Sequence, residues 1–489
     1  MVVVVMGHID HGKSTLLDYL RTANVAANEA GGITQAVGAY ELERNGQRLT
    51  FLDTPGHEAF AAIRERGARL ADIAVLVIAG DDGVKPQTRE ALAAIQASQI
   101  PFIIAINKMD KSGANAERVK QELAEENVLV EGYGGTIPAV AVSAKTGAGV
   151  DELVELILLS GELAGLNSAG GDAETATTGF VLEARLDPQI GVVATLIIKT
   201  GQLRGGDWLV VENQAAKIKI LRDFQGRPVK TLAASAPAQV VGPSALPPVG
   251  AAFQIYADKK LAEAAAETFV KKVAAASAGA DAADAAKTEI TVPLVLKADV
   301  SGSLEALKRE LYKLAGERVG LKILAAGVGP INENDVKLAG GSPEALILGF
   351  RVKAERAALE LGEKLRLPVR TFEIIYELSE WLATELERRT PRQEIEEVIG
   401  RAKMLKLFGE RGGKQVIGGV VQSGLAQTGK TFKIFRRENE IGRGKIVELQ
   451  EQKLPSKEVV QDHQFGALVE AKPTVAAGDI LEIFNLVTK

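Results

Sequence analysis

Residues 7–14, GHIDHGKS, follow the apolar run VVVVM and lead into TLLDYL. They fit the pattern G-x-x-x-x-G-K-[ST], placed between a strand and a helix. The glycines let backbone N–H groups approach phosphate oxygens, Lys13 reaches the β- and γ-phosphates, and Ser14 offers a hydroxyl to Mg²⁺. The helix N-terminus adds its dipole. The stretch predicts a nucleotide-binding α/β domain whose phosphate loop comprises Asp10, His11, Gly12, Lys13, Ser14 and Thr15.

Further apolar runs indicate how this domain continues. They alternate with polar-apolar segments of helical length, as in a mostly parallel sheet buried on both faces. The runs are Leu49–Leu52, Ile73–Ala79, Phe102–Ile106 and Ala139–Val142. We expect the domain to occupy residues 1–168.

Asp53-Thr54-Pro55-Gly56-His57 comes directly after the run Leu49–Leu52. An acid at this strand end can hold Mg²⁺ through water, and the N–H of Gly56 can turn towards a γ-phosphate. An alternative is that Asp53 only caps a turn. We expect His57 to orient the attacking water, and its protonation state stays open.

Two loops predict that the base is guanine. Asn107-Lys108-Met109-Asp110 follows a buried strand, and the carboxylate of Asp110 can accept from both the N1–H and the 2-amino group of guanine. Adenine offers neither donor there. Asn107 would tie this loop to the phosphate loop, and Lys108 would lie over the base. The next strand leads into the triplet Ser143-Ala144-Lys145, which supplies a backbone N–H for the guanine O6.

Gly31-Gly32-Ile33-Thr34 lies between the first helix and the next strand. A hydroxyl from Thr34 would complete the Mg²⁺ shell only when γ-phosphate is bound, and the glycines would let the loop rearrange. A Gly-rich surface loop explains the same residues. The expected metal-binding side chains are therefore Ser14, Thr34 and Asp53.

The rest of the chain divides by pattern. Short β-branched runs over 175–257 predict a small antiparallel barrel. The Ala-, Glu- and Lys-rich stretch 258–288 predicts a helical connector. Three parts follow: a small α/β domain (289–373), a long connecting helix broken at Pro391 (374–401), and a C-terminal β-barrel (402–489).

Composition excludes several kinds of site. The 489 residues are 46% hydrophobic and 25% charged, as in a globular protein of several domains. Because there is no cysteine, disulfides, thiolate metal sites and cysteine nucleophiles are excluded, and a reducing compartment such as the cytoplasm is favoured. No apolar run reaches the ~18 residues of a transmembrane helix, so we expect no membrane partner.

Charge is unevenly distributed along the chain. The net charge is −5, yet residues 401–450 hold eleven Lys/Arg against four Glu. A basic terminal module on an acidic protein indicates a phosphate-bearing partner. An ordinary solvated barrel surface explains the same pattern.

The motifs together resemble the translational GTPases. The stretches that carry this resemblance are GHIDHGKSTLLD (7–18), EAGGITQAVGAY (29–40), DTPGHEAF (53–60), NKMD (107–110) and SAK (143–145). Residues 294–307, 327–339 and 347–352 resemble the third domain of bacterial translation initiation factor 2. Elongation factors have no such domain, so an elongation-type carrier is disfavoured.

The resemblance implies GTP or GDP and Mg²⁺ as ligands, and both ribosomal subunits and initiator tRNA as partners. Such a factor joins initiator tRNA to the small subunit, promotes joining of the large subunit, and leaves after hydrolysis. The resemblance also implies a monovalent cation near Asp10 and places Ile9 and Ile33 beside His57. We expect a monomer. Relatives often have long N-terminal regions, so this chain is either a shortened or a naturally short form.

The C-terminal barrel departs from the family pattern. Where relatives have a basic S-L-K-R-F-K-like strand, this chain has Glu448–Lys453. Where they have an E-C-G triplet near the formyl-methionyl end, it has Gln464-Phe465-Gly466, and only Gly466 is retained. The remaining candidates for acceptor-stem phosphates are Lys433, Arg436, Arg437, Arg443 and Lys445.

Two functions therefore stay open. One is a ribosome-dependent GTPase that delivers initiator tRNA. The other is a GTP-gated ribosome- or RNA-binding factor that does not select the formylated initiator. Both share the nucleotide domain and differ in residues 400–489.

Overall fold

The chain forms two units, Met1–Arg389 and Thr390–Lys489, which are described one at a time. The computed structural model describes residues 1–21, 37–44, 46–166, 176–276, 290–314, 319–389, 394–411, 413–437 and 439–488. Within these ranges, no helix has the length and apolar character needed to cross a membrane.

A six-stranded sheet organises residues 1–163. Its order is β2-β3-β1-β4-β5-β6, and every neighbouring pair is parallel except β2 with β3. The predicted α/β fold with a mostly parallel sheet is thus confirmed. Its elements are β1 (Val2–Gly7), α1 (Lys13–Arg21), β2 (Gly38–Arg44), β3 (Gln47–Asp53), the 3-10 helix η3 (Glu58–Phe60), α2 (Ala61–Leu70), β4 (Ile73–Ala79), α3 (Pro86–Ser98), β5 (Phe102–Asn107), α4 (Ala116–Glu125), β6 (Ala139–Ala141) and α5 (Val150–Leu163).

Helices cover both faces of this sheet, which explains why its strands are apolar throughout. Val2 and Val4 of β1 belong to an apolar cluster with residues of α2, α3 and α4, whereas Val3 and Val5 belong to a cluster with residues of α1 and α5. Successive side chains of a strand point to opposite faces, so both sets are buried. The polar loops are left at the carboxyl ends of the strands, where ligands bind in such sheets.

Residues 178–256 form an antiparallel sheet with the order β11-β10-β15-β7-β8-β14-β12. Strands towards both ends of this order contribute to one core, with Leu209 of β10 and Leu221 of β12 in the same apolar cluster, as in a barrel. The strands of this region are β7 (Thr178–Asp187), β8 (Gly191–Thr200), β9 (Gln202–Arg204), β10 (Trp208–Val211), β11 (Gln214–Lys217), β12 (Ile220–Arg222), β13 (Thr231–Ala233), β14 (Pro237–Val241) and β15 (Ala252–Tyr256). Strands β9 and β13 pair with each other in a separate two-stranded sheet.

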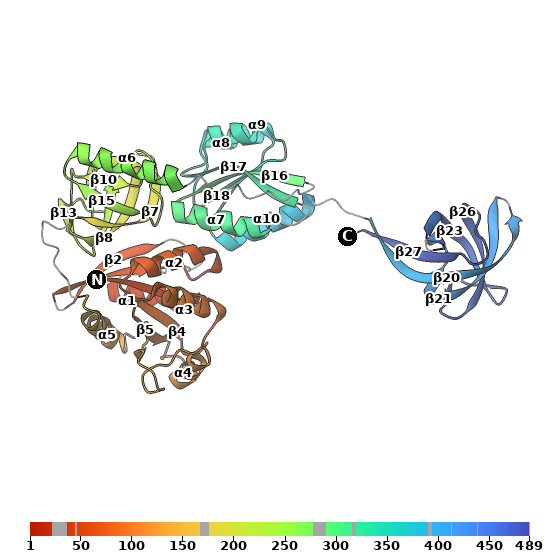
Figure 1. Cartoon of the computed structure of the whole chain (residues 1–489), viewed down its shortest axis with the longest axis horizontal. Helices are drawn as coiled ribbons and strands as arrows, with labels where there is room; N and C mark the ends of the chain where they lie inside the picture. Colours follow the sequence, from red (N-terminus) through yellow and green to blue (C-terminus); the bar gives the residue numbers. More distant parts are fainter. Residues whose placement is uncertain are drawn as a thin grey trace. The chain divides into compact units, whose positions relative to one another are not determined.

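A helix and a second parallel sheet complete the first unit. Helix α6 (Lys259–Ala276) packs Ala262 and Ala266 against Val210 of β10. The sheet has the order β17-β16-β18-β19, with α7 and α10 on one face and α8 and α9 on the other (Figure 1). Its elements are β16 (Ile290–Ala298), α7 (Ser301–Leu314), β17 (Val319–Val328), α8 (Glu333–Ala339), β18 (Leu346–Phe350), α9 (Arg356–Leu365), β19 (Val369–Phe372) and α10 (Ile375–Arg389).

Part of the nucleotide domain enters the core of this second sheet. Phe60 of η3 and Ile63 of α2 share an apolar cluster with Leu294 and Leu348 of the sheet and with Leu378 of α10. Arg66 of α2 also forms an ion pair of 2.8 Å with Glu305 of α7. The segment that follows Asp53-Thr54-Pro55-Gly56 is therefore packed against residues from the 290–389 region.

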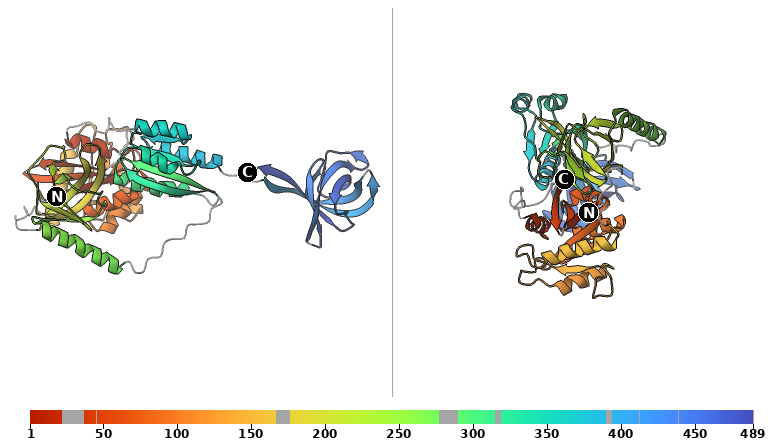
Figure 2. Two further views of the ribbon diagram at one scale, coloured as in Figure 1. Left: turned by 90° about the horizontal axis from the view of Figure 1, so that it is seen from above. Right: turned by 90° about the vertical axis from the view of Figure 1, so that its left-hand side faces the viewer.

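The second unit is a closed antiparallel barrel. The strands follow the order β20-β27-β22-β23-β26-β21, and β21 pairs back onto β20. Figure 2 shows these strands, in blue, curving round to meet. The strands of this unit are β20 (Glu394–Arg411), β21 (Lys414–Gln427), β22 (Thr431–Arg436), β23 (Asn439–Glu451), β24 (Leu454–Pro455), β25 (Glu458–Val460), β26 (Gln464–Lys472) and β27 (Ile480–Thr488). The short strands β24 and β25 pair with β23 and β21, beside the closed ring.

The prediction of a long connecting helix over residues 374–401 was wrong in two respects. Helix α10 is no spacer, because Leu378 and Leu382 are buried in the core of the sheet beside it. Beyond the helix, Glu394–Arg411 is a long strand. Gly400, Ala402 and Met404 are buried in alternation with exposed neighbours, so a period of two and pairing with β21 and β27 outweigh the local helical preference.

Candidate nucleotide-binding site

The phosphate loop joins β1 to α1 and has the backbone that its glycines permit. Gly12 has φ +82°, and Asp10 also lies in the left-handed region at φ 62°. A Cβ on Gly12 would lie 2.5 Å from the Asn107 amide nitrogen, so a side chain there would both strain the backbone and displace Asn107. Thr15, in the first turn of α1, is exposed.

Lys13 is buried beneath this loop. Its Nζ donates to the carbonyls of Gly7 at 2.9 Å and His8 at 2.6 Å. Burial lowers the pKa of Lys13 to about 8, opposed by the nearby carboxylate of Asp53. A Cβ on Gly56 would stand 2.6 Å from Nζ, so the loop after β3 approaches Lys13 this closely only because residue 56 is glycine.

Two of the three expected metal-binding side chains lie together. The Ser14 hydroxyl donates to Asp53 Oδ2 at 3.3 Å, and Asp53 is 9% exposed. The adjacent Thr54 donates to the Val5 carbonyl at 2.8 Å, which fixes the end of β3 against β1. Hydroxyl and carboxylate oxygens are the donors that Mg²⁺ prefers, so this pair fits the ion. The predicted loop 31–34, with Thr34, lies outside the described residues.

His11 is the deepest side chain of the phosphate loop. It is 1% exposed, and its Nε2 lies 3.3 Å from Asp82 Oδ2. Burial lowers the pKa of His11 to about 4, so the ring is neutral at neutral pH. Asp82 in turn binds Lys85 at 2.8 Å. His11 therefore supports the phosphate loop from below, through its contact with Asp82.

Asn107 connects the two halves of the site. Its amide nitrogen donates to the carbonyls of His11 at 2.9 Å and Gly12 at 3.4 Å. Its amide oxygen accepts from the N–H of Ala144 at 2.9 Å. One buried side chain thereby holds the phosphate loop and the loop after β6 in a fixed relation.

Asp110 stands at the open edge of the site. The Ser143 hydroxyl donates to Asp110 Oδ1 at 2.7 Å and lowers the pKa of that carboxyl, so it is ionised at neutral pH. Lys108 has φ 62° and Lys145 is exposed nearby. An exposed carboxylate fixed on one oxygen leaves acceptor capacity for two adjacent N–H groups.

His57 lies at the N-terminus of η3 and faces the 290–389 region. Its Nδ1 accepts from the N–H of Ala59 at 2.9 Å. Its ring centroid is 4.0 Å from that of Tyr376 and 6.0 Å from that of Phe60. Burial is the main cause of a lowered pKa for His57, which keeps the ring neutral. Of the two isoleucines expected beside it, Ile33 lies outside the described residues.

Arg64 is a site residue that the sequence reasoning missed. It is 1% exposed and is the largest of the fully buried side chains. Its guanidinium donates to the carbonyls of Pro55 and His57 and pairs with Glu90 at 2.5 Å. Because a buried arginine needs several partners, Arg64 fixes the loop between Asp53 and η3. An arginine among the apolar positions of α2 was the only sequence signal.

Three stretches match known families. Residues 1–160 match the Elongation factor Tu GTP binding domain, residues 176–255 match Elongation factor G domain 2, and residues 264–383 match Translation-initiation factor 2. Over 496 residues the chain is 38% identical to Translation initiation factor IF-2 of Clostridium perfringens (strain 13 / Type A), and the match covers 99% of this chain and 72% of that protein. The chain belongs to the translation initiation factor 2 family.

Other proteins of that name are of similar identity but longer. The match to the one from Lachnoclostridium phytofermentans is 39% identical and covers 99% of this chain and 44% of the relative. The match to the one from Synechococcus sp. (strain JA-3-3Ab) is 40% identical and covers 100% of this chain and 48% of the relative. The chain thus spans about half the length of these relatives. The protein in a crystal structure of GDP-bound aIF5B from Aeropyrum pernix is 25% identical in sequence. The structural match covers 99% of this chain and 92% of that chain, with a TM-score of 0.46.

In this member of the initiation factor 2 family, most of the predicted tRNA-contacting cations already have partners within the barrel. Arg436 binds both carboxylate oxygens of Asp479 at 2.8 Å. Arg443 pairs with Glu440 at 2.9 Å and with Glu396 at 2.6 Å, and Lys433 also pairs with Glu396. The two remaining candidates, Arg437 and Lys445, are exposed.

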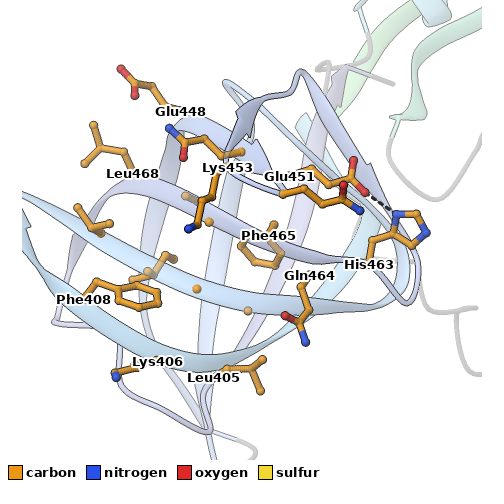
Figure 3. Close-up of a pocket in the computed structure, with 18 residues that line it drawn as sticks. Leu405, Lys406, Phe408, Glu448, Glu451, Lys453, His463, Gln464, Phe465 and Leu468 are labelled. Carbon is orange, nitrogen blue, oxygen red and sulfur yellow. Dashed lines mark hydrogen bonds and ion pairs between the residues drawn. The ribbon is translucent and has the colours of Figure 1, made fainter.

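A groove of about 780 Å³ lies on a different part of the barrel from these ion pairs. Figure 3 shows Phe408, Phe465 and Lys453 gathered on its face, with the 2.5 Å pair of Glu451 and His463 at one side. Gly466 lines it as well, and a Cβ there would meet no atom within 4 Å. The groove has its own cations, Lys406 and Lys453, which the sequence analysis did not propose as contacts of tRNA.

Proposed function

We propose that this chain is a GTP-dependent translation initiation factor. It binds and hydrolyses GTP on the ribosome, binds initiator tRNA, and promotes joining of the two ribosomal subunits. Family membership supports the process, and the Asn107 bridge between the two loops is the observation that carries the nucleotide chemistry. The proposal includes action as a monomer in the cytoplasm.

Guanine specificity rests on Asp110. Its carboxylate, ionised and held by Ser143, accepts from the N1–H and the 2-amino group of guanine. The N–H of Ala144 donates to Asn107, so Asn107 fixes the loop 143–145, to which the proposal assigns recognition of the O6 of the base. Lys108 and Lys145 flank the same edge. Adenine would offer the carboxylate no donor, so the hydrogen bonds to water that the carboxylate gives up on binding would not be replaced.

The phosphates take the place of the loop carbonyls as partners of Lys13. The ammonium group, now bound to Gly7 and His8, is within reach of the β- and γ-phosphates. Ser14 and Asp53, with Thr34, would hold Mg²⁺, which neutralises charge between these phosphates. Asp10, in its left-handed conformation at the mouth of the loop, is the proposed contact of a monovalent cation.

Hydrolysis needs one water placed in line with the γ-phosphate, and His57 is the proposed residue that orients it. The N–H of Gly56 detects the γ-phosphate, because that glycine already abuts Lys13. The test is GTP hydrolysis by the full chain with and without ribosomes, with binding of initiator tRNA measured in parallel. Turnover that does not respond to ribosomes would overturn the proposal.

A second candidate is a GTP-gated ribosome- or RNA-binding factor without selectivity for formylated initiator tRNA. The internal ion pairs of Lys433, Arg436 and Arg443 favour it, since cations engaged in this way contribute less to phosphate binding. Protection of the aminoacyl ester from hydrolysis separates the two candidates. Equal protection of formylated and unformylated initiator tRNA would support the second one.

A further inference from the structure

The imidazole of His57 has no nitrogen available to a water molecule in this structure. Nδ1 is occupied by the N–H of Ala59, so the neutral ring carries its proton on Nε2. Nε2 is buried and lacks a hydrogen-bond partner among the described residues. A residue that must orient water in hydrolysis is thus held where it cannot reach one.

Tyr376 is the side chain that covers this ring. It belongs to the first turn of α10, and its ring lies 4.0 Å from the imidazole at an interplanar angle of 41°. Tyr376 is itself 45% exposed, so the contact lies at the rim of the interface and not in its core. Leu378 and Leu382, fully buried, fix the helix that presents it.

The backbone on either side of His57 is fixed independently of Tyr376. Arg64 binds the carbonyl of His57, and Glu58 pairs with Lys313 of α7 at 2.6 Å. Phe60 is buried in the apolar cluster shared with the second sheet. Loss of Tyr376 therefore frees the imidazole ring without releasing the segment that carries it.

We propose that Tyr376 is a positioning residue for His57, holding the imidazole in a resting orientation that withholds it from the nucleotide. The proposal rests on the role given above to His57 in orienting water. Displacement of α10 would uncover the ring and give Nε2–H the partner that it lacks. Because an unpaired buried donor is costly, the rotation towards water is favoured once Tyr376 is withdrawn. Hydrolysis is in this way coupled to movement of the 290–389 region.

Tyr376→Leu in the full chain tests this coupling. We expect kcat of ribosome-free GTP hydrolysis to rise roughly 3- to 10-fold, as loss of one aromatic contact shifts a two-state equilibrium by about that factor. KM for GTP should stay within about twofold, because no contact to nucleotide changes. Tyr376→Phe, which keeps the ring, should behave as the parent. Tyr312→Leu on α7 is the matched control, since Tyr312 is 56% exposed and forms no ring contact with His57.

The double variant His57→Ala/Tyr376→Leu shows whether the effect passes through His57. The gain should vanish in it; a gain that persists, or a folded Tyr376→Leu protein with unchanged or lower kcat, overturns the proposal. If His57→Ala alone leaves ribosome-stimulated hydrolysis intact, the role of His57 itself fails. The positioning proposal then falls with it.

An NMR measurement tests the contact without turnover. The chain has only four histidines, so the imidazole C2–H signal of His57 is assigned by its loss in His57→Ala. The signal should shift in Tyr376→Leu and stay in place in Tyr312→Leu. An unshifted signal in Tyr376→Leu overturns the proposal, even where His57 proves essential for hydrolysis.

Discussion

The nucleotide domain and the C-terminal barrel place charged side chains in opposite ways. In the first, polar residues follow parallel strands at one edge of a sheet, where hydroxyl groups hold the carboxylates and the buried amide of Asn107 joins two of the loops. In the second, charges lie along antiparallel strands and pair with acids on neighbouring strands, as Lys433 does with Glu396. Motifs at fixed spacing therefore indicate a site better than a local excess of charge does.

The largest expected effect is at Asp110. Asp110→Asn should lower GTP affinity roughly 10³-fold and move the preference to xanthosine triphosphate, because the amide no longer offers two acceptors to guanine. Competition binding with both nucleotides measures this. Asp151→Asn, at an exposed position in α5, is the control. If the variant still prefers GTP, Asp110 does not read the base, and the fixed-spacing motif has failed to indicate the site.

His57→Ala comes next. We expect ribosome-stimulated hydrolysis to fall by roughly 10²-fold, with GTP affinity nearly intact, as for loss of a water-positioning group. Single-turnover hydrolysis on ribosomes measures it, with His463→Ala in the barrel as the control. Unchanged turnover would remove His57 from the mechanism.

Arg436→Met tests whether the ion pairs of the barrel serve its structure. Asp479 is 2% exposed and would lose both contacts to the guanidinium, so the barrel should lose about 1–3 kcal/mol of stability. Faster amide hydrogen exchange in β22 and β27 measures this. Unaltered exchange together with weakened tRNA binding would show that Arg436 serves the ligand instead.

The smallest effect is expected at the exposed cations. Arg437→Ala/Lys445→Ala should weaken tRNA binding a few-fold and lower the slope of log affinity against log salt by about one per residue. Lys406→Ala/Lys453→Ala on the groove is the matched comparison. If the salt dependence changes more in Lys406→Ala/Lys453→Ala, the RNA contacts the groove and not the face formed by β22 and β23.

Much of the first domain could be predicted from sequence because its information is local. Gly12, Asp53 and Asp110 lie at or shortly after the carboxyl ends of the buried strands β1, β3 and β5, and a parallel sheet brings these ends to one edge. Tyr376 and Arg64 could not be found in this way. The first meets His57 only through the packing of a distant helix, and the second is defined by backbone carbonyls, which no residue pattern reveals.

The long strand β20 shows the opposite limit. Ile395, Val398 and Ile399 recur at spacings that also suit a helix, and the two glutamates between them favour one. Only the partners supplied by β21 and β27, many residues later, decide for a strand. Local preference is overruled where closure of a barrel needs an extended neighbour.

The pairing of β20 with β27 also governs how the barrel would respond to force. Glu394 lies opposite Thr488, so the entry and the exit of the unit stand side by side at one end of an antiparallel seam. A force applied between these two residues pulls β20 and β27 apart in the unzipping geometry, so their hydrogen bonds break one residue pair at a time. In the shear geometry, all the pairs would bear the force together. Because Glu394 and Thr488 are adjacent, the barrel is suited to circular permutation: a short linker would join these two residues, and new termini would be made at an exposed turn.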